Sequence, residues 1–101
     1  MISTQKIIIG IDAGTSVIKA VAFDPSGRQI ATASVRNRYT TGDDGSATQS
    51  LDQTWLDCAS ALRGLSEKVP DLASRTAAIA VTGQGDGTWL VGRGNTPVAD
   101  A

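Results

Sequence analysis

The stretch GIDAGTSVIKAVAFD, from Gly10 to Asp24, carries the strongest indication of the fold. It continues the apolar run KIIIGI (Lys6–Ile11), breaks at DAGTS, and resumes as VIKAVAF (Val17–Phe23). Apolar, largely β-branched runs of this length are typical of strands, and the first run predicts a strand buried on both faces. Small and hydroxyl-bearing residues between two strands predict a tight turn. The stretch therefore predicts an antiparallel pair whose turn carries polar groups.

The next segment extends this pair. DPSG (Asp24–Gly27) predicts a turn, because proline presets the backbone and glycine accepts a positive φ. RQIATASV (residues 28–35) predicts a third strand, which completes an antiparallel meander. The polar, glycine-containing residues 37–50 predict a loop.

A helix is predicted after this loop. Ser50-Leu51-Asp52-Gln53 matches the capping-box pattern, with Ser50 or Asp52 as the cap. Pro70 ends the helical region. Helical spacing predicts one apolar face, formed by Trp55, Cys58, Ala59, Leu62 and Leu65.

The remaining elements are strands. TAAIAVTG (Thr76–Gly83) predicts another buried strand, and QGDG (Gln84–Gly87) predicts a turn. Residues 88–92 and 96–101 flank RGN and predict a hairpin. The order is β-β-β-α-β plus a hairpin, which is an α/β arrangement. The strand-like end predicts that the chain is part of a larger domain.

Composition limits the classes of function. The 101 residues are 41% hydrophobic and 19% charged, with a net charge of −1, which fits one domain or a piece of one. The absence of a basic excess and the low aromatic content, 4%, argue against nucleic-acid and anionic-membrane partners. No run approaches the ~20 apolar residues of a membrane span, and the N-terminal run is too short for a signal peptide. A cytoplasmic location is expected.

Side-chain chemistry narrows the possibilities further. The sequence has one cysteine, Cys58, and no histidine. Zinc sites of the Cys and His type and mechanisms with a histidine base are therefore excluded. Cys58 on the helix's apolar face predicts an inert buried thiol, and Trp55 and Trp89 predict packing residues. Asp43 and Asp44 lie in a polar loop and are expected to be solvated.

DAGTS suits a phosphate group. Gly14 lets a phosphate approach the backbone, and Thr15 and Ser16 offer hydroxyls and N–H groups. Asp12 would repel phosphate directly, but it is a hard oxygen ligand for Mg²⁺ or its waters. Lys19 reaches the same phosphates from the next strand. The residues alone leave an ordinary turn, with Lys19 in solvent, equally open.

VTGQGDG (Val81–Gly87) is a second polar strand end. Asp86 accepts hydrogen bonds from alcohols, and Gln84 both donates and accepts, which suits recognition of hydroxyls. The residues alone favour a glycine-rich tight turn.

The whole chain resembles the FGGY carbohydrate kinases. IIIGIDAGTSVIKAVAFDPSGRQIA is similar to their N-terminal phosphate-binding hairpin, and SLDQTW and AIAVTGQGDGTWLVGRGNTPVADA follow in the family's order and spacing. DxGT alone also fits actin-like and chaperone-like ATPases and ROK proteins. Within the family, GQGDGTWLVG is most similar to the kinases that act on erythritol. The resemblance implies a ribonuclease-H-like (actin-like ATPase) fold and ATP-dependent phosphorylation of a polyol or sugar hydroxyl.

The resemblance also implies roles for individual residues. Asp12 would lie at the Mg²⁺ site. Gly85 stands where glycerol kinases carry arginine, which disfavours glycerol and leaves room for a longer polyol. At the position of Asp86, glycerol kinases also carry an acidic residue, whereas xylulokinases carry histidine. An acidic residue there favours a linear polyol over a ketose. The nucleotide-phosphate site would contain Gly14, Thr15, Ser16 and Lys19, and the substrate site would contain Gln84, Gly85 and Asp86.

Family kinases are much longer than this chain. Residues 1–101 are therefore expected to be a partial N-terminal domain, with the general-base aspartate and adenosine-binding segments beyond Ala101. The alternatives are a catalytically inactive fragment, or an ATPase or sugar-sensing regulator of the actin-like or ROK type. The expected partners are a small polyol or sugar and, in a possible homo-oligomer, further copies of the chain.

Overall fold

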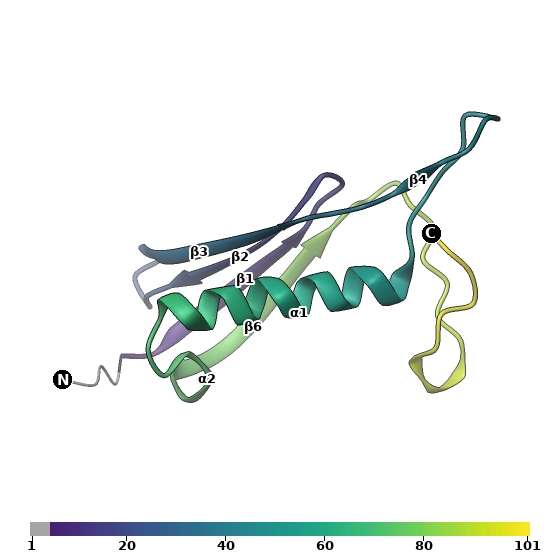
Figure 1. The fold of residues 1–101 in the computed structure, drawn as a ribbon. Coiled ribbons are helices and arrows are strands. Elements are labelled where there is room, and N and C mark those ends of the chain that lie inside the picture. The colour runs from purple at the N-terminus through teal and green to yellow at the C-terminus, as the bar shows by residue number, and fades with distance from the viewer. Residues whose placement is uncertain (1–4) are drawn as a thin grey trace.

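The computed structural model describes residues 5–101, which form a sheet with a long helix against one face (Figure 1). The strand order in the sheet is β3-β2-β1-β6. β1, β2 and β3 are antiparallel neighbours, which confirms the predicted meander, whereas β6 runs parallel to β1. The bounds of the strands are Ile7–Ala13 for β1, Val17–Phe23 for β2, Gln29–Arg36 for β3 and Thr76–Gly83 for β6.

The predicted turn between β2 and β3 is confirmed. The Asp24 carboxylate accepts hydrogen bonds from the Ser26 N–H at 2.9 Å, the Ser26 hydroxyl at 2.6 Å and the Arg28 N–H at 3.0 Å. These bonds lower the pKa of Asp24 below 3.8, and the bond from the Ser26 hydroxyl has the largest effect. Gly27 has a φ of 89°, which glycine adopts without strain.

The prediction of a loop over residues 37–50 is wrong in part. β4 (Thr40–Thr41) and β5 (Ala47–Thr48) pair as a two-stranded ribbon that extends away from the body (Figure 1). Its turn closes through a 2.8 Å bond from the Gly42 N–H to the Ser46 carbonyl. Glycines on both sides of an acidic pair allow this reversal, and Asp43 and Asp44 are exposed at the tip as predicted.

The start of the helix follows half of the predicted capping box. α1 (Leu51–Lys68) is capped by Ser50, whose hydroxyl accepts from the Gln53 N–H at 3.2 Å. The Gln53 side chain does not return to Ser50 and donates to Asp57 at 3.0 Å. α1 ends before Pro70, and the short α2 (Leu72–Arg75) follows.

The predicted apolar face of α1 is rotated in the structure. Trp55 is 76% exposed, so its assignment as a packing residue is wrong, whereas Cys58, Ala59 and Leu62 are half-buried. The buried side chains of α1 are those of Asp57, Ala61 and Leu65. The reason is tertiary, because α1 packs across β2 and β3 and only touches β1.

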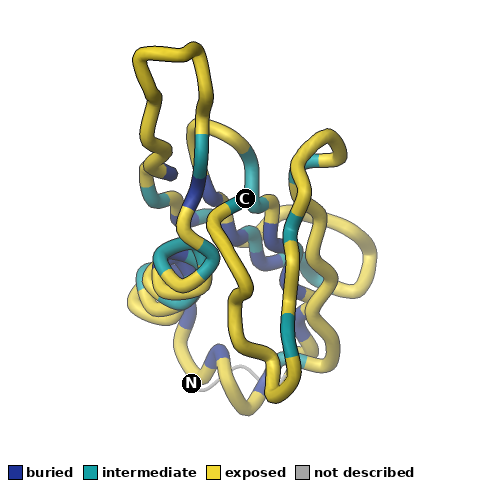
Figure 2. Tube along the Cα trace, turned by 90° about the vertical axis from the view of Figure 1, so that its right-hand side faces the viewer, coloured by how far each residue is buried: buried dark blue, intermediate teal, exposed yellow. Residues whose placement is uncertain are grey.

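The sheet is covered on one face, so the prediction that the first strand is buried on both faces is wrong. Ile7, Ile9 and Ile11 are buried in the core with Ile18 and Leu65, whereas Ile8 is 41% exposed. The predicted burial of β6 is also wrong, because only its first residue is partly covered (Figure 2). Within residues 5–101, β6 is an edge strand that α1 does not cover.

The exposed β6 predicts self-association of the 101-residue chain. β6 offers an open strand edge and the side chains of Ile79, 52% exposed, and Val81, 68% exposed. Such edges pair with other chains unless a charge interrupts them. We expect a concentration-dependent increase in mass by sedimentation analysis, reduced by Val81→Lys and unchanged by Ala73→Lys. A monomer at all concentrations would contradict this expectation.

The last residues form the predicted hairpin in an irregular form. Val91 and Pro97 form an antiparallel bridge, and the 3₁₀ turn η1 (Arg93–Asn95) connects the two arms. Ala101 and Gln49 exchange two backbone hydrogen bonds of 2.8 Å, which join the chain end to the segment before α1. No helix within residues 5–101 has the length and hydropathy needed to cross a bilayer.

Candidate functional site

The two polar loops predicted from the sequence leave the same edge of the sheet. β1 and β6 are parallel neighbours, and Ala13 pairs with Gly83 at their carboxyl ends. Adjacent strands lie about 4.8 Å apart, so residues 14–16 and residues 84–86 begin side by side. Loops at the carboxyl ends of parallel strands are where open α/β sheets bind ligands.

The two charged residues on either side of the first loop, Asp12 on β1 and Lys19 on β2, lie on the face away from α1. Asp12 pairs with Lys19 of β2 and with Thr82 of β6, and these positions alternate with the buried Ile11 and Ile18. A hollow of about 310 Å³ on this face is lined by both charged side chains. Within residues 5–101, neither Asp12 nor Lys19 forms an ion pair, so both charges are available to a ligand.

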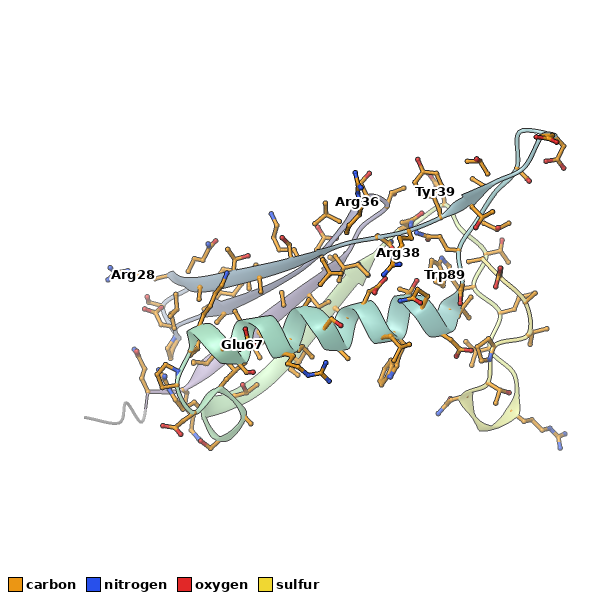
Figure 3. All side chains as sticks on the ribbon, viewed as in Figure 1. Arg28, Arg36, Arg38, Tyr39, Glu67 and Trp89 are labelled. Carbon is orange, nitrogen blue, oxygen red and sulfur yellow. The ribbon has the colours of Figure 1, made fainter. Side chains whose placement is uncertain are left out.

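A further cation at this edge was not predicted. Arg36 ends β3 and pairs with Val17, which places it on the face of Lys19, and its side chain points away from α1 (Figure 3). It forms no ion pair with any residue from 5 to 101. Its position follows from strand register, which depends on where each strand starts.

The DAGTS turn depends on a close backbone approach. The Gly14 N–H donates to the Val17 carbonyl at 3.2 Å, and a Cβ at Gly14 would lie 2.9 Å from that carbonyl oxygen. Thr15 and Ser16 are exposed. In the described part of the chain, neither their N–H groups nor their hydroxyls have hydrogen-bond partners, so four donors face solvent.

Asn37, which the sequence placed only in a loop, contacts this turn directly. It is 6% exposed and follows β3. Its side-chain Nδ2 donates to the Gly14 carbonyl at 2.6 Å, and its N–H donates to the Ser16 carbonyl at 2.9 Å. A polar residue directly after a strand was the only signal, and it does not specify a partner.

Of the three predicted residues in the second loop, Gln84 forms a side-chain hydrogen bond, whereas Gly85 and Asp86 are exposed. Gln84 is half-buried and donates through Nε2 to Oε1 of Gln49 at 2.8 Å. Gly85 and Asp86 are exposed, and no atom of residues 5–101 lies within 4 Å of a Cβ built at Gly85. The Asp86 carboxylate has no partner among residues 5–101. Gln49, 7% exposed, was missed because nothing local marks its contact.

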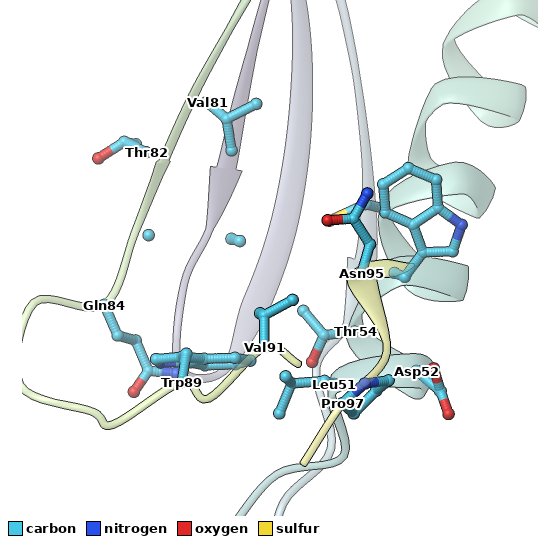
Figure 4. A pocket seen from close by; sticks show the side chains of 14 residues that line it. Leu51, Asp52, Thr54, Val81, Thr82, Gln84, Trp89, Val91, Asn95 and Pro97 are labelled. Carbon is cyan, nitrogen blue, oxygen red and sulfur yellow. The ribbon is translucent and has the colours of Figure 1, made fainter. Parts of the chain in front are cut away.

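A groove of about 880 Å³ lies on the other face, between the first turns of α1, the end of β6 and the C-terminal hairpin (Figure 4). The Gln84 side chain lies beside the Trp89 ring there. Trp89 is half-buried, which agrees with its predicted packing role. The structure therefore places Gln84 on the α1 side and Asp12 with Lys19 on the opposite side. The groove is also lined by Leu51, Trp55, Cys58, Val81, Val91 and Pro97.

Asp12, the residue predicted to contact a metal ion, offers an exposed carboxylate beside the DAGTS turn. Residues 5–101 contain no group of three or more acidic, cysteine or histidine side chains that could enclose a metal. Mg²⁺ typically keeps several waters and binds one or two carboxylates together with phosphate oxygens. A single exposed carboxylate beside free backbone donors fits that mode.

Cys58 faces the groove and is predicted to react slowly. Burial raises the pKa of the Cys58 thiol above 9.0, and the charge of Asp57 raises it further. The thiolate is the nucleophile, so a higher pKa lowers its fraction at pH 8. We expect iodoacetamide to alkylate Cys58 more slowly than free cysteine, with a midpoint shifted to higher pH. Equal or faster alkylation would contradict this.

Comparison with known proteins identifies the family. Residues 7–101 match the N-terminal domain of the FGGY family of carbohydrate kinases. The chain is 76% identical over 95 residues to the erythritol kinase of Brucella abortus strain 2308, covering 94% of this chain and 18% of that protein. It is 31% identical over 94 residues to the xylulose kinase of Lactococcus lactis, covering 93% of this chain and 19% of that protein. The chain thus spans about a fifth of the length of these relatives.

Solved structures show the same fold. A xyloylose kinase from Brucella ovis superposes with a TM-score of 0.85 at 23% identity, over 93% of this chain and 20% of that chain. A gluconate kinase from Lactobacillus acidophilus gives a TM-score of 0.82 at 23% identity, over 95% of this chain and 19% of that chain. These likenesses confirm the predicted ribonuclease-H-like (actin-like ATPase) fold. The chain therefore belongs to the FGGY family of carbohydrate kinases and matches its N-terminal domain.

Proposed function

We propose that the full-length enzyme transfers the γ-phosphoryl group of ATP to a polyol hydroxyl, with erythritol as the substrate. Residues 1–101 would be a partial N-terminal domain that supplies part of the phosphate site and part of the polyol site. The observation that carries the proposal is the parallel register of β1 and β6, which starts the two polar loops side by side. The high identity to an erythritol kinase supports the choice of polyol.

The phosphate side of the site is assigned to the DAGTS turn. Thr15 and Ser16 would donate N–H and hydroxyl groups to phosphate oxygens, and Gly14 keeps the approach to the backbone open. Lys19 would neutralise phosphate charge from β2. Asp12 would hold Mg²⁺ through its carboxylate or bound waters. When bound, Mg²⁺ neutralises the charge that develops on the transferred group.

The polyol side is assigned to the loop after β6. Asp86 would accept hydrogen bonds from substrate hydroxyls. Gln84, held by Gln49 through its nitrogen, would present its carbonyl oxygen as a second acceptor. Gly85 would leave the space that a four-carbon chain needs.

The general base is assigned to a part of the enzyme beyond Ala101, because the resemblance implies an aspartate there. Phosphoryl transfer depends mainly on positioning and charge stabilisation, so a partial site should not turn over. The 101-residue chain is therefore expected to be inactive alone. The cytoplasmic location and a homo-oligomeric assembly remain predictions.

The substrate assignment can be tested through Gly85. We expect kcat/KM of the full-length enzyme to be higher for erythritol than for glycerol, xylulose or gluconate. Gly85→Arg should lower kcat/KM for erythritol about hundredfold, because the arginine would fill the open space and crowd the longer polyol. A loss of this size is comparable with the loss of one well-made contact in a substrate pocket. The enzyme should remain folded, because no atom of residues 5–101 lies within 4 Å of the new Cβ.

Ala73→Arg adds the same charge on α2, before the opposite end of β6, and serves as the control. It should leave kcat/KM for erythritol unchanged. A Gly85→Arg enzyme with wild-type erythritol kinetics would remove this loop from the polyol site. Preference of the wild type for a ketose would reject erythritol.

A further inference from the structure

We propose that Asn37 is a positioning residue, which orients the Gly14–Ser16 turn so that the Thr15 N–H faces the nucleotide phosphates. This inference rests on the proposed function and adds a residue to its phosphate site. Asn37 would not touch the nucleotide itself. It would act through the backbone of the turn.

Asn37 holds the turn at two points. Its Nδ2 donates to the Gly14 carbonyl at 2.6 Å, and its backbone N–H donates to the Ser16 carbonyl at 2.9 Å. These bonds connect the turn to a residue 23 positions away, at the end of β3. Asn37 is 6% exposed, so water competes little for these contacts. The turn is therefore fixed from β3 as well as by its own bond to Val17.

The geometry of the peptide unit gives these contacts a direction. In a planar trans peptide the C=O and the following N–H point in opposite directions. The bond from Asn37 to the Gly14 carbonyl therefore aims the Thr15 N–H away from Asn37. That N–H has no partner within residues 5–101. The Gly14 N–H is already bonded to Val17, so the Thr15 N–H is the first free amide of the turn.

The amide of Asn37 is itself held in one orientation. Its Oδ1 accepts from the Arg38 N–H at 3.0 Å, which directs Nδ2 towards Gly14. An aspartate of nearly the same shape would place an acceptor against the Gly14 carbonyl. Two acceptors at that distance repel, and the turn would lose its side-chain contact. Asn37→Asp is therefore a more specific test than removal of the side chain.

The experiment uses the full-length enzyme and compares Asn37→Asp with Gln29→Glu. Gln29 begins β3 at the opposite end of the strand and is exposed, so this control makes the same amide-to-acid change away from the turn. For Asn37→Asp we expect the KM for ATP to rise at least tenfold, which is the effect of one lost hydrogen bond and a misdirected amide. The KM for erythritol should change less than twofold, and the control should match the wild type. The melting temperature is measured for each enzyme.

Wild-type KM for ATP in a folded Asn37→Asp enzyme would overturn the inference. So would an equal rise in both KM values, because a purely structural role affects both substrates. A second measurement on the wild type needs no variant. On addition of Mg-ADP, the amide resonance of Thr15 should shift more than that of Gly14, and an unshifted Thr15 would also overturn it. If wild-type enzyme binds Mg-ADP but phosphorylates no polyol, the proposed function fails, while this measurement still tests whether the Thr15 N–H faces the nucleotide phosphates.

Discussion

Replacing Asp12 with asparagine is expected to lower kcat of the full-length enzyme about 10³-fold, the order found when one group that stabilises transition-state charge is removed. The Asp12 carboxylate lies beside the DAGTS turn, and carboxylates are suited to Mg²⁺ or its waters. The substitution keeps the size of the side chain and removes the charge. Turnover should therefore fall much more than nucleotide affinity, because Thr15, Ser16 and Lys19 still contact the phosphates.

The Asp12→Asn enzyme should keep its stability. The Asp12 carboxylate is exposed and forms no hydrogen bond or ion pair within residues 5–101. Surface charges of this kind contribute little to folding. Asp43→Asn, at the tip of the β4–β5 ribbon, is the matched control and should be fully active. An Asp12→Asn enzyme with wild-type kcat would remove Asp12 from the phosphoryl-transfer site.

Gly14→Ala is expected to raise the KM for ATP about hundredfold. The added Cβ would lie 2.9 Å from the Val17 carbonyl oxygen, closer than real Cβ contacts allow. Either the bond from the Gly14 N–H to that oxygen breaks or the turn widens. Both changes move the Thr15 and Ser16 amides, and small displacements of positioning groups can cost two orders of magnitude.

Gly10→Ala, on β1 before the turn, provides the control. Its Cβ would lie 3.5 Å from the Phe23 ring, which is an ordinary contact. We expect nearly wild-type kinetics, measured as initial rates over a range of ATP concentrations. Equal KM values for the Gly14→Ala and wild-type enzymes would contradict the phosphate assignment of this turn.

The strand order of the meander was predictable because its signals are local. The apolar runs, the DPSG turn and the Ser50 cap each lie within a few residues, and each appears in the structure. Burial was less predictable. The run Thr76–Gly83 has the composition of a core strand, yet β6 is exposed because α1 lies over β2 and β3. Trp55 fits a helical period, but the same placement of α1 leaves it in solvent.

The types of residue in the candidate site were predictable from the sequence, but their arrangement in space was not. DAGTS and GQGDG carry the expected groups, but only the pairing of Ala13 with Gly83 brings the two loops together. Asn37 contacts a carbonyl 23 residues away, and Gln49 contacts a side chain 35 residues away. Contacts of this length depend on the sheet register, which the sequence does not display locally.

The proposed kinase activity is tested most directly by transfer of the γ-phosphoryl group from ³²P-labelled ATP to erythritol. The full-length enzyme and the 101-residue chain are assayed in parallel with Mg²⁺, and labelled erythritol phosphate is separated from ATP. We expect labelled product from the full-length enzyme and none from the 101-residue chain. A folded full-length enzyme that hydrolyses ATP or binds erythritol without forming this product would contradict this expectation.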